Sequence, residues 1–244
     1  MRNIIVTGGS RGIGLGIARK LAGSNHHVIT VARSSNDALE SAIAEVETSR
    51  TGKISCFPLD LSKIDDLREA AREIRKTFGP IYGLVNNAGL GTPGVLGNMA
   101  EADILRLTQL NIVSPMVFTK HVLRSMLVQR SGRIVNISSI VAITGYQGIS
   151  VYSATKASML GFTRSLAREV GGLGITVNAV LPGFTDTEMT GEMGEKERAR
   201  VANRAALKRL TNIADIANMV DYLVSDQAEG ITGSSLVIDA GATA

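Results

Sequence analysis

Tyr152 and Lys156 are the two side chains of this sequence whose types and spacing best suit acid–base chemistry. They are four residues apart, so on a helix they would share one face. A phenol is an efficient proton donor when its pKa, about 10 if unperturbed, moves toward the working pH. A nearby ammonium group favours the phenolate and lowers that pKa. The spacing therefore predicts a general acid, Tyr152, that is tuned by Lys156.

Ser139 precedes Tyr152 by thirteen residues and directly follows a predicted strand, residues 132–138. A hydroxyl at the end of that strand would reach the same point from the edge of a sheet and hydrogen-bond the carbonyl oxygen of a substrate. A Tyr-x-x-x-Lys pair by itself is common on solvated helices. The catalytic interpretation therefore depends on Ser139 and on the N-terminal motif described below.

Asn111 lies inside a long apolar stretch, residues 101–129, that is predicted to be helical, where asparagine is unfavourable. Pro115 follows four residues later and has no N–H, so in an α-helix the carbonyl of Asn111 would lose its donor. We expect this carbonyl to hold a water that connects to Lys156 and relays protons from solvent. The alternative is a simple kink in the helix.

A glycine-rich segment, residues 7–14 (TGGSRGIG), follows the first predicted strand and opens a helix. Gly8 permits a tight turn, Gly12 lets the backbone approach a pyrophosphate, and Gly14 lets the helix pack closely on the strand. The first turn of the helix offers N–H groups and a favourable dipole to phosphates. In this context the motif predicts a dinucleotide site.

Short apolar runs alternate with amphipathic stretches along the chain. Strands are predicted at residues 3–7, 27–31, 54–59, 82–86, 132–138, 175–181 and 235–238, and helices at 14–22, 36–49, 64–78, 101–129, 152–170 and 213–224. Most strands are rich in Val and Ile without clean alternation, which indicates burial on both faces. The pattern predicts an α/β fold: a single Rossmann-type, doubly wound parallel sheet of about seven strands with helices on both faces. We expect residues 1–244 to form one domain.

Residues 184–210 form a polar, charge-rich insertion after the sixth predicted strand. Its basic residues are Lys196, Arg198, Arg200, Arg204, Lys208 and Arg209. The insertion leaves the carboxyl edge of the sheet, where open α/β sheets bind ligands. Because of this position, we expect a mobile lid over the substrate rather than a solvent-exposed helical segment.

Composition argues against several functional classes. The net charge of +4 is spread along the chain, tryptophan is absent and other aromatic residues are few, so we expect no nucleic-acid partner. No apolar run is long enough to span a bilayer, and the chain starts on a strand-like segment, so we expect a cytoplasmic protein, or the mature form of an organellar one, without a membrane partner. Cys56 is predicted to be a buried structural thiol. His26, His27 and His121 show no metal-ligand spacing, so no catalytic metal is expected.

The motifs together resemble the classical short-chain dehydrogenase/reductase family. The resemblance rests on the spacing Thr-Gly-x-x-x-Gly-x-Gly, on residues 86–89 (NNAG), Asn111, Ser139, Tyr152 and Lys156, and on Pro182 with Gly183, and it covers essentially the whole chain. It implies an oxidoreductase that transfers hydride between a nicotinamide cofactor and a ketone or secondary alcohol. Asn111, Ser139, Tyr152 and Lys156 would be its catalytic residues, and Lys156 would also bind the nicotinamide ribose. The family resemblance further implies a homotetramer, with helices 101–129 and 152–170 at one interface.

The end of the second predicted strand bears on cofactor choice. An NAD-preferring site places a carboxylate there to bind the ribose hydroxyls, and that carboxylate would repel a 2′-phosphate. This chain instead has Ala32, followed by Arg33 and Ser34, and Arg11 projects from the glycine-rich turn. Two guanidinium groups without an acid suit a phosphate, so the sequence predicts NADP(H).

The expected cofactor site draws on residues from the whole chain. They are Gly8, Ser10, Arg11, Gly12, Ile13 and Gly14 in the first loop, with Arg33 and Ser34 after the second strand. The resemblance adds Asp60 and Leu61 beside the adenine, Asn87, Ala88 and Gly89 on the adenosine and ribose side, and Pro182, Gly183, Thr185 and Thr187 at the nicotinamide end, together with Tyr152 and Lys156.

Within the family, the chain resembles bacterial 3-oxoacyl-[acyl-carrier-protein] reductases through residues 182–189 (PGFTDTEM), the lid length and residues 231–233. This implies NADPH-dependent reduction of a 3-oxoacyl thioester in fatty acid biosynthesis, with acyl carrier protein as a partner. Arg130 fits one of two basic docking positions, but the second is Leu173. Two other places also depart from the pattern of these reductases. One is the stretch before Tyr152, residues 148–151 (GISV), and the other is Ala240, which stands where an Asp-Gly-Gly motif is common.

Two alternatives therefore stay open. One is a pathway-specific enzyme that acts on a sugar, a steroid, a quinone or another secondary alcohol or ketone. The other is a non-enzymatic NADP-binding scaffold or sensor on the same fold. Such proteins typically lack the tyrosine or the lysine, both of which are present here.

Overall fold

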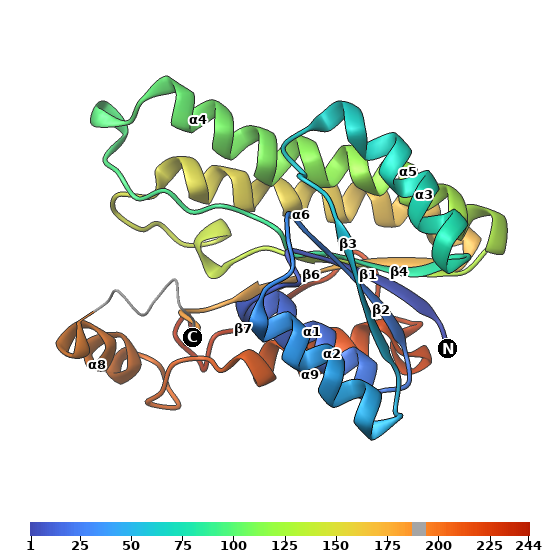
Figure 1. Cartoon of the computed structure of the whole chain (residues 1–244). Coiled ribbons are helices and arrows are strands. Elements are labelled where there is room, and N and C mark those ends of the chain that lie inside the picture. Colours follow the sequence, from blue (N-terminus) through green and yellow to red (C-terminus); the bar gives the residue numbers. More distant parts are fainter. Residues whose placement is uncertain (187–193) are drawn as a thin grey trace.

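A parallel sheet of seven strands forms the centre of the molecule (Figure 1). The computed structural model describes residues 1–186 and 194–244. The strands are β1 (Asn3–Thr7), β2 (His27–Ala32), β3 (Lys53–Pro58), β4 (Ile81–Asn86), β5 (Gly132–Ile137), β6 (Ile175–Pro182) and β7 (Ser235–Ile238). Their order is β3-β2-β1-β4-β5-β6-β7. The chain runs outward from β1 to one edge and then outward from β4 to the other, so the strand order reverses between β1 and β4. Open α/β sheets bind ligands at such a switch point.

The central strands are buried on both faces, as their runs of branched apolar residues predict. Every residue of β4, β5 and β6 is buried, whereas the edge strand β7 is only partly covered. Side chains above and below the sheet form two separate apolar clusters. The sheet is therefore a rigid base whose strand ends and following loops can hold side chains in fixed positions.

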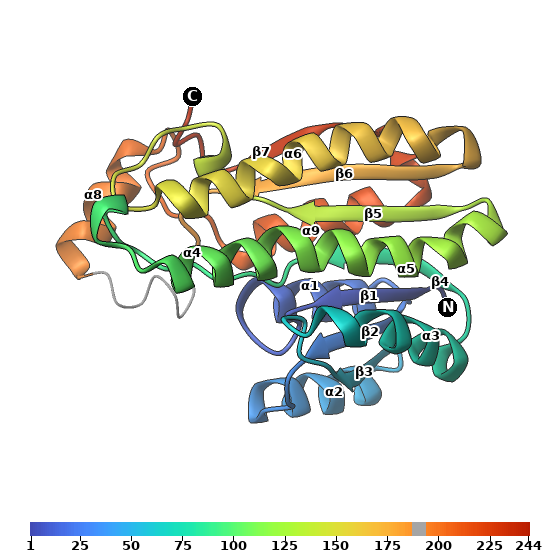
Figure 2. The same cartoon turned by 90° about the horizontal axis from the view of Figure 1, so that it is seen from above.

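Helices cover both faces of the sheet (Figure 1). One layer consists of α1 (Gly12–Gly23), α2 (Asp37–Ser49) and α9 (Ile213–Val224), and the other of α3 (Leu67–Phe78), α4 (Glu101–Thr108), α5 (Ser114–Gln129) and α6 (Ser150–Val170). Helix α8 (Glu195–Arg204) lies outside both layers, at the end of the molecule where α4 begins, and buries none of its residues (Figure 2).

The predicted fold class is confirmed, and the predicted boundaries agree with the observed ones to within one or two residues for most elements. Three details differ. The stretch 64–78 begins with a 3₁₀ turn, Ile64–Asp66, before α3. The long helix predicted at 101–129 contains a π-helical turn between α4 and α5. Cys56 is only half-buried, although it packs against the apolar cluster between the sheet and helices α1, α2 and α9. No helix in the described part of the chain is long and apolar enough to cross a membrane.

Candidate active site

The helix that carries Asn111 changes its hydrogen-bond register at this residue. α4 runs into a π-helical turn, Gln109–Val113, in which the N–H of Ser114 donates to the carbonyl of Gln109 five residues earlier. Such turns often lie at functional sites. The sequence predicted that the carbonyl of Asn111 has no N–H donor, because in an α-helix its donor would be Pro115. In a π register the residue five positions on is Met116, which has an N–H, so a water relay through this carbonyl stays a prediction.

The Asn111 side chain, 3% exposed, connects the π turn to two other segments. Its Oδ1 accepts from the N–H of Leu90 at 2.8 Å, and its Nδ2 donates to the carbonyl of Leu90 at 2.8 Å. The same Nδ2 donates to Oγ1 of Thr155 on α6 at 3.0 Å. The amide is thus fixed between the loop after β4 and the helix that carries Tyr152 and Lys156.

The loop after β5 brings Ser139 to Tyr152. Ser139 begins a 3₁₀ turn, and its hydroxyl accepts from the N–H of Val141 at 3.3 Å. The Ser139 side chain lies close enough to the Tyr152 phenol to act on its pKa. The neighbouring Ser138 hydroxyl donates to the carbonyl of Lys156 at 2.8 Å, which ties the end of β5 to the start of α6.

Lys156 is buried at the same place, with 6% of its surface exposed. Its Nζ donates to the carbonyl of Ile137 at 2.9 Å and lies 5.8 Å from the centre of the Tyr152 ring. A Cβ atom on Gly89 would lie 3.2 Å from Asn111 Oδ1 and 3.4 Å from Lys156 Nζ. The structure therefore brings Asn111, Lys156 and Gly89 together, with little room for a side chain on the glycine.

Burial controls the charges of this cluster. It raises the pKa of Tyr152 to about 12, an effect that the neighbouring Ser139 side chain partly opposes. It lowers the pKa of Lys156 to about 8. Desolvation is the largest cause of the Tyr152 shift, so in the chain by itself the net pKa of Tyr152 is raised, and the tuning of this group by Lys156 stays a prediction. Tyr152 therefore holds its proton at neutral pH, as a proton donor must.

The glycine-rich loop has the shape that an anionic ligand needs. Gly8 and Gly12 have φ angles of 64° and 53°, which favour glycine. A Cβ atom on Gly12 would meet nothing within 4 Å, so the backbone there faces open space. Helix α1 starts without a side-chain cap and without an acid in its first turn. Its first N–H groups can bind a phosphate, so the residues present fit the pyrophosphate of a dinucleotide.

The start of α1 is packed against the loop itself. A Cβ atom on Gly14 would overlap the carbonyl oxygen of Gly8 and would lie 2.5 Å from Asn87 Nδ2. The sequence predicted a close approach of Gly14 to the strand, and the structure shows that the loop and the Asn87 amide are what it approaches. Ser10 and Ile13 lie in the same turn.

Asn87 and Ala88 hold the glycine-rich loop from the neighbouring strand. Both backbone N–H groups donate to Oγ1 of Thr7 at 3.0 Å. The side-chain Nδ2 of Asn87 donates to the carbonyls of Thr7 at 2.9 Å and Gly8 at 3.3 Å. The Asn87 amide nitrogen is therefore engaged with protein, a positioning contact that the sequence did not predict.

Two exposed arginines lie on adjacent loops. Arg11 follows β1, and Arg33 and Ser34 follow β2. The N–H of Gly8, in the first of these loops, donates to the carbonyl of Val31 in β2 at 2.8 Å. Arg33 also lies close enough to Asp60 to help lower the pKa of that carboxyl, although hydrogen bonds from Ser62 contribute more.

Asp60 is partly engaged within its own loop. Its Oδ1 accepts from the N–H of Ser62 at 3.0 Å and from the Ser62 hydroxyl at 2.7 Å. Leu61 is buried next to it and lines a cavity of about 10 Å³ together with Thr7 and Ala88. Leu61 thus adjoins the end of β1 and the loop after β4, whereas Asp60 lies near Arg33 in the loop after β2.

The base of the insertion after β6 is closed by backbone pairing. The N–H of Asp186 donates to the carbonyl of Thr211 at 3.1 Å, and that of Thr211 donates to Phe184 at 3.0 Å. Thr185 Oγ1 donates to the carbonyl of Gly183 at 3.0 Å. A Cβ atom on Gly183 would lie 2.7 Å from Cβ of Asp239, so the chain passes β7 closely after Pro182.

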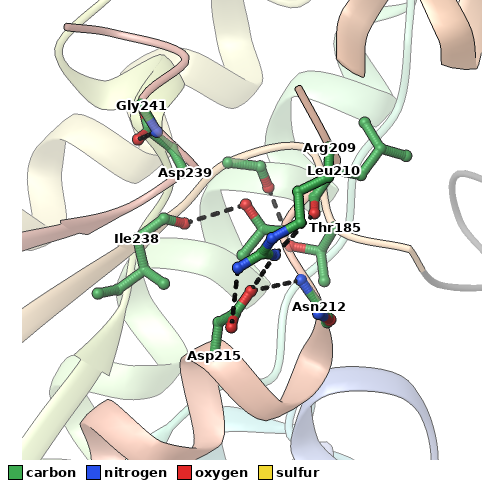
Figure 3. Close-up of polar contacts among 10 residues, drawn as sticks. Thr185, Arg209, Leu210, Asn212, Asp215, Ile238, Asp239 and Gly241 are labelled. Atoms are coloured by element: carbon green, nitrogen blue, oxygen red, sulfur yellow. Dashed lines mark hydrogen bonds and ion pairs between the residues drawn. The ribbon is translucent and has the colours of Figure 1, made fainter. Parts of the chain in front are cut away.

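Arg209 joins the end of the insertion to α9. Its Nη1 contacts a carboxylate oxygen of Asp215 at 2.6 Å (Figure 3). Asp215 also accepts from the N–H of Asn212 at 2.9 Å, as part of the capping box that begins α9. Thr187 lies outside the described residues, together with residues 188–193 of the predicted lid.

Sequence reasoning missed Thr155, Ser138 and Leu90, which orient the predicted catalytic residues. Their only sequence signal is proximity, because Thr155 lies between Tyr152 and Lys156, Ser138 precedes Ser139, and Leu90 follows residues 86–89. Among the described residues, no group of three or more His, Cys, Asp or Glu side chains is placed to hold a metal ion.

Comparisons with known proteins match nearly the whole chain. The family model for short chain dehydrogenases matches residues 2–198. The chain is 38% identical to the 3-oxoacyl-[acyl-carrier-protein] reductase FabG of Escherichia coli (strain K12), over 97% of this chain and 95% of that protein. It is 35% identical to the FabG of the same description from Staphylococcus epidermidis (strain ATCC 12228 / FDA PCI 1200), over 98% of both.

Solved structures are similar over the full length. A short-chain dehydrogenase/reductase from Serratia marcescens BCRC 10948 has a TM-score of 0.92 at 36% identity, covering 100% of this chain and 98% of that one. A blue fluorescent protein from a metagenomic library, solved in complex with NADPH, has a TM-score of 0.92 at 34% identity with the same coverage.

Proposed function

Because the chain belongs to the short-chain dehydrogenase/reductase family, it is an oxidoreductase acting on CH–OH or C=O groups, and we propose that it reduces a 3-oxoacyl thioester with NADPH. The family binds a nicotinamide cofactor. The observation that carries the proposal is the grouping of Ser139 and Tyr152 next to buried Lys156, in a chain that matches 3-oxoacyl-[acyl-carrier-protein] reductases over 97% of its length. The product would be the 3-hydroxyacyl thioester.

In this proposal Tyr152 is the general acid. A bound nicotinamide supplies the hydride. Tyr152 holds a proton at neutral pH and gives it to the oxygen that becomes the alcohol. Ser139, next to Tyr152, orients the substrate carbonyl. Lys156 is mostly protonated at pH 7, so its charge favours the phenolate that Tyr152 leaves behind.

The remaining roles concern proton supply and ribose binding. Asn111 supports a relay from solvent to Lys156, consistent with its position beside Gly89 and the lysine. Lys156 and Tyr152 also contact the nicotinamide ribose in this proposal. Pro182, Gly183, Thr185 and Thr187 hold the nicotinamide end.

NADPH is the proposed cofactor because the loops that follow β1 and β2 carry Arg11 and Arg33. Ala32 ends β2, so no carboxylate occupies the position that binds ribose hydroxyls in NAD sites. The phosphates would lie over Gly8, Ser10, Gly12, Ile13 and Gly14, with Ser34 at the 2′-phosphate. Asp60, Leu61, Asn87, Ala88 and Gly89 would line the adenosine side.

Residues 184–210 are proposed to be the substrate lid of a single domain spanning residues 1–244. Both ends of this segment are anchored, by the pairing between Thr185 and Thr211 and by the ion pair of Arg209 with Asp215. Anchored ends would let helix α8, which lies between them, move without disturbing β6 or α9.

We also propose a homotetramer. Leu105 and Val128 are the most exposed large apolar side chains on α4 and α5, at 69% and 84%. Val113 and Leu127 add to the apolar surface of the same helical stretch. Exposed apolar side chains along one helical stretch are consistent with a surface that a second copy covers.

A specific observation favours a second candidate, a ketone that is not carried by a protein. Carrier-protein docking in such reductases needs two basic positions. Arg130 occupies the first and donates to the carbonyl of Gly172 at 3.3 Å. The second position is Leu173, which packs against the apolar cluster between the sheet and helices α3, α5 and α6. Docking of a carrier protein would thus depend on a single basic side chain, that of Arg130.

The test follows NADPH oxidation with acetoacetyl-CoA, with NADH as the parallel cofactor and Tyr152→Phe as the control variant. We expect NADPH-selective turnover, and a loss of about 10²-fold or more in Tyr152→Phe with NADPH binding retained. No turnover despite tight NADPH binding would reject the thioester and favour a sugar, cyclic ketone or secondary alcohol. Equal turnover with NADH would contradict the argument from Arg11 and Arg33. Unchanged activity of Tyr152→Phe would contradict the assignment of the acid.

A further inference from the structure

The hydroxyl of Thr155 both donates and accepts a hydrogen bond inside the site. The side chain is 1% exposed and lies on α6 between Tyr152 and Lys156. Its hydroxyl donates to the carbonyl of Tyr152 at 2.8 Å and accepts from Asn111 Nδ2 at 3.0 Å. A threonine hydroxyl has one proton, so the bond to Tyr152 fixes its rotation and aims a lone pair at Asn111.

The bond from Asn111 to Thr155 is a unique connection in the described part of the chain. It is the one hydrogen bond there that joins the π turn to α6. The other bonds of the Asn111 amide run to Leu90, in the loop beside Lys156 Nζ. Thr155 therefore closes a path from the catalytic helix through the π turn to the loop after β4.

We propose that Thr155 is a positioning residue that sets the distance between the π turn bearing Asn111 and the face of α6 bearing Tyr152 and Lys156. This inference rests on the proposed function for its kinetic consequence. Without the hydroxyl, the Asn111 amide keeps Leu90 but loses its tie to α6. The pocket that holds Lys156 Nζ between Gly89 and Ile137 then loosens, so proton delivery suffers more than cofactor binding.

The same helix offers a matched control in Thr163. This side chain is 0% exposed, and its hydroxyl accepts from Asn136 Nδ2 at 2.8 Å. Thr163→Val thus removes the same kind of buried bond between a threonine and an asparagine amide. Its partner lies in β5 and has no bond to Asn111, so the change disturbs packing without touching the proposed connection.

The experiment compares Thr155→Val, Thr155→Ser and Thr163→Val with the unaltered chain. kcat, KM and their pH dependence would be measured between pH 6 and 10 with NADPH and the accepted ketone, beside NADPH affinity and the urea midpoint of unfolding. We expect both valine variants to lose stability. Only Thr155→Val should lower kcat, by about tenfold to a hundredfold as for misplaced catalytic groups, and displace the alkaline limb of the pH profile. Its NADPH affinity should change less than threefold, and Thr155→Ser should restore kcat.

A readout without substrate separates this inference from the proposed function. The N–H of Leu90 donates to Asn111 Oδ1, so its hydrogen exchange reports how firmly the amide is held. We expect faster exchange at Leu90 in Thr155→Val but not in Thr163→Val. If no ketone is reduced, the proposed function fails and the exchange result still decides the role of Thr155. Unchanged exchange and kcat in folded Thr155→Val, an equal kcat loss in Thr163→Val, or a failure of serine to restore kcat would overturn the inference.

Discussion

Replacing Lys156 by methionine is expected to stabilise the folded protein at neutral pH while abolishing turnover. Burial lowers the pKa of Lys156 from 10.5 to about 8, so the desolvated ammonium group destabilises the folded chain. At about 1.4 kcal/mol per pH unit, this lowering corresponds to about 3 kcal/mol of unfolding free energy. Methionine also loses the bond to the Ile137 carbonyl, which costs about 1 kcal/mol. The expected net gain is about 2 kcal/mol.

The size of this effect depends on pH. Below pH 8 Lys156 is protonated in both the folded and the unfolded chain, so the destabilisation is constant. Between pH 8 and 10.5 the unfolded chain still binds the proton that the folded chain has released, so the stability of the unaltered chain rises with pH. Burial raises the pKa of Tyr152 to about 12, and this group lowers stability only above pH 10. The window from pH 8 to 10 therefore separates Lys156 from Tyr152.

Urea unfolding followed by far-UV circular dichroism at pH 7, 8, 9 and 10 would measure the difference, at two protein concentrations to control for assembly. Lys120→Met is the matched control, because Lys120 is exposed on α5. It should change stability by less than about 0.5 kcal/mol at every pH. The advantage of Lys156→Met should shrink steadily from pH 8 to 10. The reasoning is refuted if Lys156→Met is no more stable than the unaltered chain at pH 7, or if its advantage is independent of pH.

Three further changes test other parts of the molecule. Arg33→Glu should weaken NADPH binding about tenfold or more by removing a charge-assisted contact, and leave NADH binding within about threefold; a fluorescence titration that finds equal losses would contradict this. Ala240 has a φ angle of 57°, so Ala240→Gly should relieve about 1 kcal/mol of strain and raise the melting temperature, and a lower one would count against it. Gly14→Ala should abolish NADPH binding because the methyl group meets Gly8 and Asn87, whereas Gly23→Ala on the same helix meets open space and should bind normally. Retained binding in Gly14→Ala would show that the loop can shift.

The fold was predictable because its signal is local and repeated. Strands β4, β5 and β6 are buried along their whole length, and their runs of Val, Ile and Leu carry that burial in the sequence. The N-cap Asn36 and the capping box at Asn212 likewise mark where α2 and α9 begin. Hydrophobic periodicity averages over several turns, however. Pro115 therefore indicated an interruption of the helix, but the pattern could not specify a π turn of five residues.

The candidate site was predictable in its members and less so in its contacts. Tyr152, Lys156 and Ser139 were found by type and spacing, and the structure brings them together with Asn111. The bond between Asn111 and Thr155 joins residues 44 positions apart, so it follows from the packing of α6 on the π turn rather than from either segment. The raised pKa of Tyr152 has the same origin, because desolvation depends on every segment that covers the phenol.

The link from Asn87 to Thr7 and Gly8 has a consequence for the newly made chain. The glycine-rich segment is complete once residue 14 has been synthesised, yet its shape is held by bonds from a residue 80 positions beyond Thr7. A nascent chain that ends at Gly79 would contain β1, β2 and β3 but not the strand that carries those donors. The ability to hold a nucleotide should therefore arise abruptly during translation, when β4 enters the sheet beside β1, rather than when the motif itself emerges from the ribosome.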